Sequence, residues 1–98
     1  MKSKIKIGLF GVGHLGKIHL KCLLELHDSV EVIGFFDPND QISDEITEKY
    51  KIIRITDKKH LLELSDAVII SSPTQTLFEI SQLAIELEKH FFLEMREY

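Results

Sequence analysis

The sequence of 98 residues predicts an α/β fold, a doubly wound parallel sheet covered by helices on both faces and therefore built in three layers. Apolar runs of strand length alternate along the chain with segments whose apolar residues recur at the spacing of a helix. A Gly-x-Gly-x-x-Gly motif, formed by Gly11, Gly13 and Gly16, lies between the first apolar run and the first helical segment. A glycine turn in this position is typical of sheets that bind nucleotides at one edge.

The first half of the chain predicts two strand and helix units. Residues 4–10 alternate and then become apolar, as expected of a central parallel strand, and a helix follows from about residue 15 to 26. Residues 30–36 form a second apolar run, and a short helix is expected over 42–50. The residues expected to face the core are Leu15, Ile18, Cys22 and Leu26 in the first helix and Ile42, Ile46 and Tyr50 in the second.

The second half predicts three further strands. Residues 51–55 form a brief strand, Asp57 caps a short helix through Leu64, and 67–70 are apolar enough for a buried strand. A last helix follows the break at 71–74, and residues 91–93 form a fifth strand. In that helix one face holds Leu77, Ile80, Ala84 and Leu87, and Thr76 and Glu79 have the spacing of a capping box at its start.

These elements predict a Rossmann-like sheet of about five strands in the order 3-2-1-4-5, within a single domain over residues 1–98. Ligands of such sheets bind beyond the carboxyl ends of the strands, where the strand order reverses, here between strands 1 and 4. The candidate cofactor-binding residues at that edge are Gly11, Val12, Gly13, His14, Leu15, Gly16, Asp37, Ser71, Ser72, Pro73, Thr74 and Glu94.

The glycine motif indicates a pyrophosphate site. Gly11 permits the tight turn from strand to helix, Gly13 lets the backbone approach the phosphates, and Gly16 lets the helix pack close to the strand. The helix that follows directs its unpaired N–H groups and the positive end of its dipole at the same place. The alternative is a glycine-rich turn that serves packing alone.

Asp37 follows Gly16 by 21 residues and ends the second strand, where a carboxylate can accept hydrogen bonds from ribose hydroxyls. The alternative role is that of a turn former before Pro38. An acid here favours NAD as the cofactor because it repels a 2′-phosphate, although NADP remains possible. Ser72 and Thr74 are expected to contact the nicotinamide ribose, to cap a helix, or to do both.

The composition limits the partners that the protein can bind and indicates its cellular compartment. The net charge of −4 gives no basic footprint for nucleic acid, and no apolar run is long enough to span a bilayer. Cys22 is the single cysteine, so no internal disulfide is expected, and we expect a cytoplasmic protein with Cys22 as a buried thiol. His14 and His19 are five residues apart, which does not suit a metal site on a helix, so none is expected.

Nearly the whole chain resembles the N-terminal domain of the Gfo/Idh/MocA family, the glucose–fructose oxidoreductase and inositol dehydrogenase type. The matching residues are the glycine turn, His19, Asp37-Pro38, Ser72-Pro73-Thr74 and Lys89-His90 leading to Phe92-Leu93-Glu94. The resemblance implies that the domain binds NAD or NADP. It also implies hydride transfer with sugars, polyols or related small molecules.

Two departures from the family pattern affect catalysis. The family usually continues Glu-Lys-Pro after the fifth strand, whereas Glu94 is followed here by Met95 and Arg96, and a thioether cannot transfer protons. Leu77 stands where the family commonly has a histidine. We also expect the family's C-terminal substrate domain to be absent, and therefore no catalytic residue in this chain.

Two functions from different classes follow. The first is the dinucleotide-binding domain of a truncated oxidoreductase that needs a partner chain to supply the substrate domain. The second is a non-catalytic nucleotide-binding or sensing module that associates with itself, since Phe91, Phe92 and Tyr98 are expected to form an exposed apolar patch. A methyltransferase-like sheet is a third candidate, which the complete glycine motif disfavours.

Overall fold

The computed structural model describes residues 4–72 and 74–93, and this part of the chain contains four strands and four helices. In chain order the elements are β1 (Ile5–Phe10), α1 (His14–Glu25), β2 (Val30–Phe36), α2 (Asp40–Tyr50), α3 (Lys58–Leu64), β3 (Ala67–Ile70), α4 (Thr74–Glu86) and β4 (His90–Leu93). Each helix expected from the apolar spacing is present.

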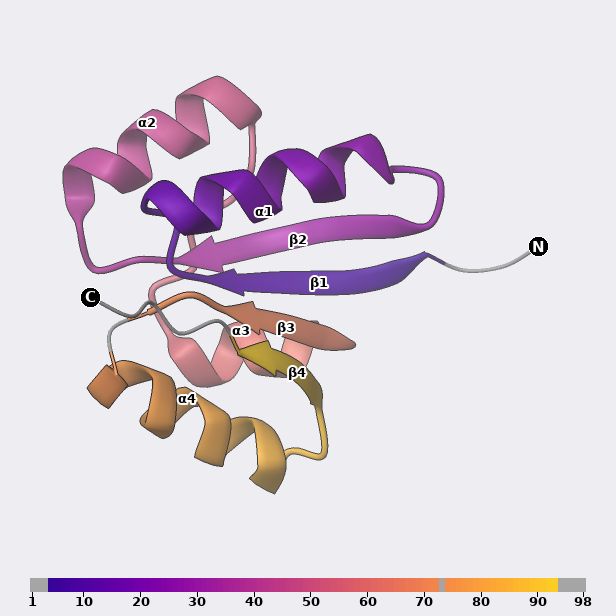
Figure 1. The fold of residues 1–98 in the computed structure, drawn as a ribbon, viewed down its shortest axis with the longest axis vertical. Helices are drawn as coiled ribbons and strands as arrows, with labels where there is room; N and C mark the ends of the chain where they lie inside the picture. The colour runs from indigo at the N-terminus through magenta and orange to yellow at the C-terminus, as the bar shows by residue number, and fades with distance from the viewer. Residues whose placement is uncertain (1–3, 73, 94–98) are drawn as a thin grey trace.

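The described strands form one parallel sheet in the order β2-β1-β3-β4 (Figure 1). All four arrowheads in Figure 1 point to the left, so the carboxyl ends of the strands meet at one edge of the sheet. The doubly wound α/β class is confirmed. The order also agrees with the predicted one, except that one expected strand does not form.

The prediction of a strand over residues 51–55 is wrong. Arg54 makes only an isolated parallel bridge to Phe35, in which the Phe35 amide donates to the Ile53 carbonyl (3.0 Å) and the Ile55 amide donates to the Phe35 carbonyl (2.8 Å). Lys51 ends α2 with a left-handed φ of 59°, and Asp57 already caps α3. The segment therefore lies at the predicted edge, outside β2, but is too short to form a ladder.

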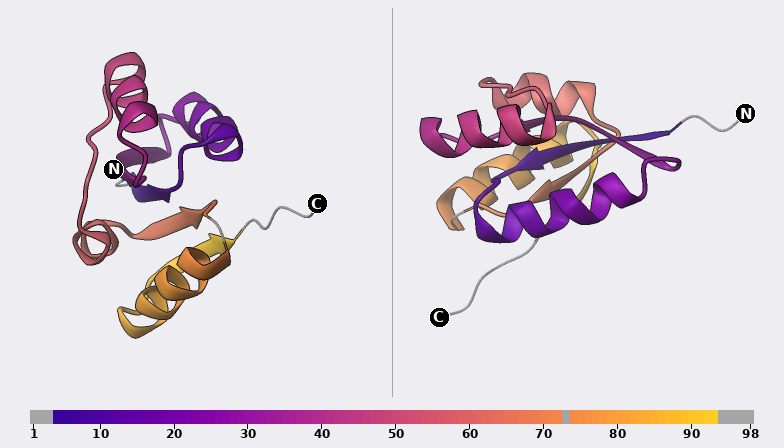
Figure 2. Two further views of the ribbon diagram at one scale, coloured as in Figure 1. Left: turned by 90° about the vertical axis from the view of Figure 1, so that its left-hand side faces the viewer. Right: turned by 90° about the horizontal axis from the view of Figure 1, so that it is seen from above.

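Each face of the sheet has its own apolar core. Leu9 and Phe10 are neighbours in β1, and because side chains of a strand alternate between faces they belong to different cores. One core joins α1 and α2 to the sheet and contains Leu9, Val12, Leu20, Phe35, Ile46 and Ile52. The other joins α3 and α4 to it and contains Phe10, Leu61, Leu62, Val68, Ile70, Leu77, Ile80 and Ala84. Figure 2 shows α1 and α3 on opposite sides of the sheet.

The predicted buried face of α1 is wrong. Gly16 and Leu20 are the buried residues of this helix, whereas Ile18, Cys22 and Leu26 are exposed. The reason is the rotation of the helix about its axis. A Cβ at Gly16 would overlap the carbonyl oxygen of Gly11, so the Gly16 face lies against the end of β1 and the residue one turn later, Leu20, enters the core.

The helix caps agree with the sequence in α3 but not in α4. The Asp57 carboxylate accepts from the amides of Lys59 and His60, as predicted. The capping box expected from Thr76 and Glu79 does not form, because α4 already begins at Thr74 and Thr76 lies inside it. Glu79 instead pairs with Lys58 of α3, 2.8 Å from its ammonium, and so links the two helices on this face.

The expected aromatic patch is only partly exposed. Phe91 is half-buried against the core of α3 and α4, whereas Phe92 is 56% exposed on the other face of β4. The ring of Phe92 meets the ring of His19 from α1 edge to face, with 6.1 Å between centroids. Tyr98 lies outside the described residues.

The rotation of α1 predicts a contrast between two apolar residues of that helix. Leu20→Ala is expected to destabilise the fold by about 2–5 kcal/mol, because it leaves a cavity in a closed core. Ile18→Ala is the matched control, and since Ile18 is 45% exposed its cost should stay within about 0.5 kcal/mol. Urea unfolding of both variants measures the difference. Equal losses would contradict the assigned rotation.

Candidate functional site

The carboxyl ends of β1, β2 and β3 bring most of the predicted cofactor-binding residues together. The Gly11 amide donates to the Phe36 carbonyl at the end of β2 (2.8 Å), and the Ser71 amide donates to the Phe10 carbonyl at the end of β1 (2.8 Å). The first bond joins the glycine turn to the end of β2, and the second joins the segment after β3 to the end of β1. The site is therefore formed where the sheet reverses its strand order, as the sequence predicts.

The three glycines of the motif have three different surroundings. Gly11 has a φ of +96°, and a Cβ there would lie 2.5 Å from the Ser71 carbonyl oxygen. Gly16 lies against the Gly11 carbonyl, which leaves no room for a side chain. Gly13 differs from both, because nothing lies within 4 Å of the place where its Cβ would be. The fold explains Gly11 and Gly16, whereas Gly13 leaves open space beside the turn.

The N-terminus of α1 lies beside the same open space, because Gly13 is also the N-cap residue of this helix. The Gly13 carbonyl accepts the first helical bond from the Lys17 amide (2.9 Å). Within the described residues no side chain caps this end. The amides of the first turn are thus available to an anion, and the helix dipole favours a negative charge there.

The Asp37 carboxylate, which the sequence predicts to bind ribose, accepts two hydrogen bonds from backbone amides. Its Oδ2 accepts from the Val12 amide of the glycine turn (3.0 Å), and its Oδ1 accepts from the Asn39 amide (2.9 Å). The second bond is the turn-forming role that the sequence left open. An ionised carboxylate has about four acceptor positions, so ribose hydroxyls can still bind to it.

Two serines after β3 differ in their hydrogen bonds. The Ser72 hydroxyl donates to the Phe10 carbonyl (3.3 Å) and so holds the loop to the end of β1. The Ser71 hydroxyl oxygen is buried and has no hydrogen-bond partner in the part of the chain that the structure describes. A buried polar group without a partner is costly, which suits a site where a polar ligand satisfies it.

The other predicted residues divide into three groups. Val12 has its side chain fully buried in the core and offers only its backbone to the site. His14 is exposed and Leu15 is half-buried in the first turn of α1. Pro73 and Glu94 lie outside the described residues, as do Met95 and Arg96, and of Thr74 only the position at the start of α4 is described.

Sequence reasoning missed Arg54 and Ser43. The Arg54 guanidinium donates to the Asp37 carbonyl (2.8 Å) and pairs with Asp40 (2.9 Å), and the buried Ser43 hydroxyl donates to the same carbonyl (3.2 Å). Both side chains therefore fix the segment that carries the Asp37 carboxylate. No motif marks either residue, and only the spacing of Asp37, Asp40 and Ser43 along the start of α2 hints at a shared structure.

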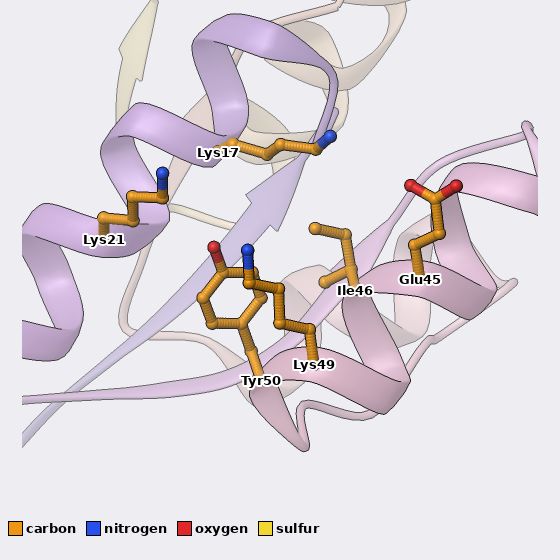
Figure 3. A pocket seen from close by; sticks show the side chains of 6 residues that line it. All are labelled: Lys17, Lys21, Glu45, Ile46, Lys49 and Tyr50. Carbon is orange, nitrogen blue, oxygen red and sulfur yellow. The ribbon is translucent and has the colours of Figure 1, made fainter.

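A separate pocket of about 240 Å³ lies between α1 and α2 (Figure 3). Its lining residues are Lys17, Lys21, Glu45, Ile46, Lys49 and Tyr50, none of which is a predicted cofactor-binding residue. In Figure 3 the ammonium of Lys49 and the hydroxyl of Tyr50 extend from α2 toward α1, and the Lys49 ammonium lies 5.5 Å from the centre of the Tyr50 ring. This pocket is thus distinct from the glycine turn.

Comparison with known proteins identifies the family. The model of the Gfo/Idh/MocA oxidoreductase family, which describes its NAD-binding Rossmann fold, matches residues 5–95. The chain belongs to this family. It is therefore an NAD-binding Rossmann domain, and the predicted NAD cofactor and fold are confirmed. Among residues 4–72 and 74–93, no helix combines the length and the apolar character needed to cross a bilayer.

Three relatives illustrate the match. UDP-N-acetylglucosamine 3-dehydrogenase of Acidithiobacillus ferrooxidans is 29% identical over 92% of this chain, and its solved structure superposes with a TM-score of 0.79. Apo scyllo-inositol dehydrogenase of Lactobacillus casei is 25% identical over 95% of the chain, with a TM-score of 0.83. The redox-sensing transcriptional repressor Rex of Staphylococcus carnosus is 31% identical over 84% of the chain.

The match covers only part of each relative. The chain spans 28% of the length of both dehydrogenases and 39% of that of the repressor. It therefore corresponds to the cofactor-binding portion of larger family members. Leu77, at the place where the family resemblance leads one to expect a histidine, is only 2% exposed and packs in the core of α3 and α4.

The surroundings of the glycines predict different effects on stability. Gly16→Ala should destabilise the fold by about 1–3 kcal/mol, because the methyl group forces α1 away from the Gly11 carbonyl. Gly13→Ala meets no atom of the protein, so it should cost only the N-cap preference for glycine over alanine, about 0.5–1 kcal/mol. Thermal unfolding of the two variants without cofactor measures both effects. A loss at Gly13 as large as that at Gly16 would refute the assignment of open space.

Proposed function

We propose that the space beside Gly13 receives the pyrophosphate of NAD, with the first-turn amides of α1 as its hydrogen-bond donors. The observation that carries this proposal is that the free protein gives no steric reason for a glycine at this position. The uncapped helix end and the buried, unpartnered Ser71 hydroxyl support it, because both suit a polar, negatively charged ligand. The residues present therefore fit the cofactor of the family.

Asp37 is proposed to bind the hydroxyls of the adenosine ribose. Its carboxylate is already oriented by the Val12 and Asn39 amides, so little conformational freedom is lost when a ribose binds. The same negative charge disfavours a 2′-phosphate, which makes NAD the preferred cofactor and NADP the weaker one. Ser72 to Thr74, after β3, are proposed to lie at the nicotinamide end, with Glu94 beyond β4.

The proposed reaction is hydride transfer between a sugar or polyol hydroxyl carbon and the nicotinamide. The names of the dehydrogenase relatives, which act on UDP-N-acetylglucosamine and scyllo-inositol, support this substrate class. The nicotinamide supplies the hydride chemistry, and this chain supplies binding and orientation. Substrate positioning and proton transfer are assigned to a partner chain or further domain, in a cytoplasmic oxidoreductase that is not catalytic without it.

A nucleotide-sensing module is the second candidate. The match to the repressor Rex, whose name describes redox sensing, favours it. Exposed apolar side chains also support a role in association, either with a second copy or with a partner chain. The exposed large apolar side chains include Ile18 and Leu26 of α1 and Phe92 of β4. Turnover of a sugar or polyol distinguishes the oxidoreductase, whereas a change of oligomeric state on NADH binding without turnover distinguishes the sensor.

Calorimetric titration with NADH tests the proposed pyrophosphate site. Gly13→Val should weaken NADH binding by about tenfold or more, because its side chain fills the space assigned to the phosphates. The variant should remain folded, with a cooperative thermal unfolding transition, although valine is a poorer N-cap residue than glycine. Gln82→Val, at an exposed position two turns into α4, is the control and should bind NADH normally. Normal NADH binding by a folded Gly13→Val would remove the basis of the proposal.

The ribose assignment has its own test. Asp37→Asn should weaken NADH binding by about tenfold and NADPH binding less, because it removes charge-assisted bonds to the ribose and the repulsion of a 2′-phosphate. The ratio of the two dissociation constants measures the effect. Asp44→Asn removes a charge from an exposed position of α2 and serves as the control. An unchanged ratio in Asp37→Asn would leave Asp37 as a turn former only.

A further inference from the structure

Arg54, Asp37 and Asp40 form a cluster beside the carboxyl end of β2. The Arg54 Nη2 donates to the Asp37 backbone carbonyl (2.8 Å), and its Nη1 lies 2.9 Å from the Asp40 Oδ1. The bridge between the Arg54 and Phe35 backbones fixes the base of this side chain. The guanidinium is thus held next to the residue proposed to bind the ribose, although it comes from a segment 17 residues later in the chain.

The two bonds of the guanidinium differ in strength. The Arg54 side chain is 25% exposed and its bond to the Asp37 carbonyl is partly buried, whereas the Asp40 side chain is 85% exposed. An ion pair with so exposed a carboxylate adds little stability and is easily exchanged for water or another anion. The guanidinium is therefore kept in place by the backbone, and Asp40 is its replaceable partner.

We propose that the Arg54–Asp40 pair is a second determinant of cofactor preference, in addition to the Asp37 carboxylate. Arg54 is the side chain that would bind the 2′-phosphate of NADP, since its planar N–H groups match phosphate oxygens. Asp40 occupies Nη1 and offsets the charge of the guanidinium, so the domain favours NAD. This inference rests on the proposed binding of the dinucleotide at Asp37.

The charges of the cluster explain the direction of the preference. The cluster contains the carboxylates of Asp37 and Asp40 but only one guanidinium, that of Arg54, which pairs with Asp40 and binds the Asp37 backbone carbonyl. It therefore keeps an excess negative charge at the place where a phosphate monoester would add about −1.5 to −2 more. Replacing Asp40 by asparagine removes this excess and releases Nη1. The change should leave α2 intact, because Asn39, not Asp40, caps the helix by accepting from the Ile42 amide (3.0 Å).

The test compares NADH and NADPH affinities by calorimetry at constant ionic strength. Asp40→Asn should tighten NADPH binding by about tenfold, the effect of one charge-assisted hydrogen bond, and change NADH binding by no more than about twofold. Asp44→Asn removes the same charge one turn later in α2, from an exposed residue without an ion pair among the described residues, and should leave the ratio unchanged. The double variant Arg54→Gln/Asp40→Asn, compared with Arg54→Gln, should show no gain of NADPH affinity.

Each contrary result has a separate meaning. An equal shift in Asp40→Asn and Asp44→Asn, or a gain that persists without Arg54, would overturn the inference because the effect would then be one of overall charge. If Asp40→Asn binds NADH and the ratio of the NADH and NADPH dissociation constants is unchanged, the inference is also overturned, but the proposed function is not. A wild type that binds neither dinucleotide would refute the proposed function itself, and this inference with it. Thermal midpoints show that each variant remains folded.

Discussion

The close approach of Gly16 to the Gly11 carbonyl is the contact on which the rest of this structure depends. It places the N-terminus of α1 directly over the end of β1 and fixes the rotation of the helix. Leu20 then enters the core, and the exposed Ile18 and Leu26 face outward. The same contact orients the first-turn amides toward the space beside Gly13. One packing constraint thus sets both the core beneath α1 and the donors of the candidate site.

Asp37 connects the site to the rest of the fold. One carboxylate holds the glycine turn through Val12 and shapes the next turn through Asn39, while its own carbonyl is held by Ser43 and Arg54. The edge that carries the candidate site is therefore held in place by the protein's own hydrogen bonds, and such preorganisation reduces the entropy lost on binding a ligand. It also means that loss of NADH binding alone does not separate the proposed ribose role of this acid from its structural role. Even asparagine keeps only one of the two acceptor oxygens, so the ratio of the NADH and NADPH affinities is the measure that separates them.

The two faces of the sheet are covered unequally. On one face α3 and α4 bury the residues of β3 and β4, and Leu77 is part of that core. On the other face α1 and α2 cover β1 and β2, while Phe92 of β4 remains 56% exposed and meets the ring of His19 edge to face. An apolar side chain in this position suits contact with a further domain or a partner.

The sequence by itself determined the α/β class, the order of the strands that form and the edge of the sheet where the candidate site lies. These depend on local signals: apolar runs, helical spacing, a glycine motif and an acid after the second strand. Only the tertiary structure decided which face of α1 is buried, that residues 51–55 form a single bridge, and that Arg54 and Ser43 hold the Asp37 segment. The physical reason is that these features arise from contacts between residues far apart in the chain. Apolar periodicity allowed two faces for α1, and the steric limit at Gly16 selected one of them.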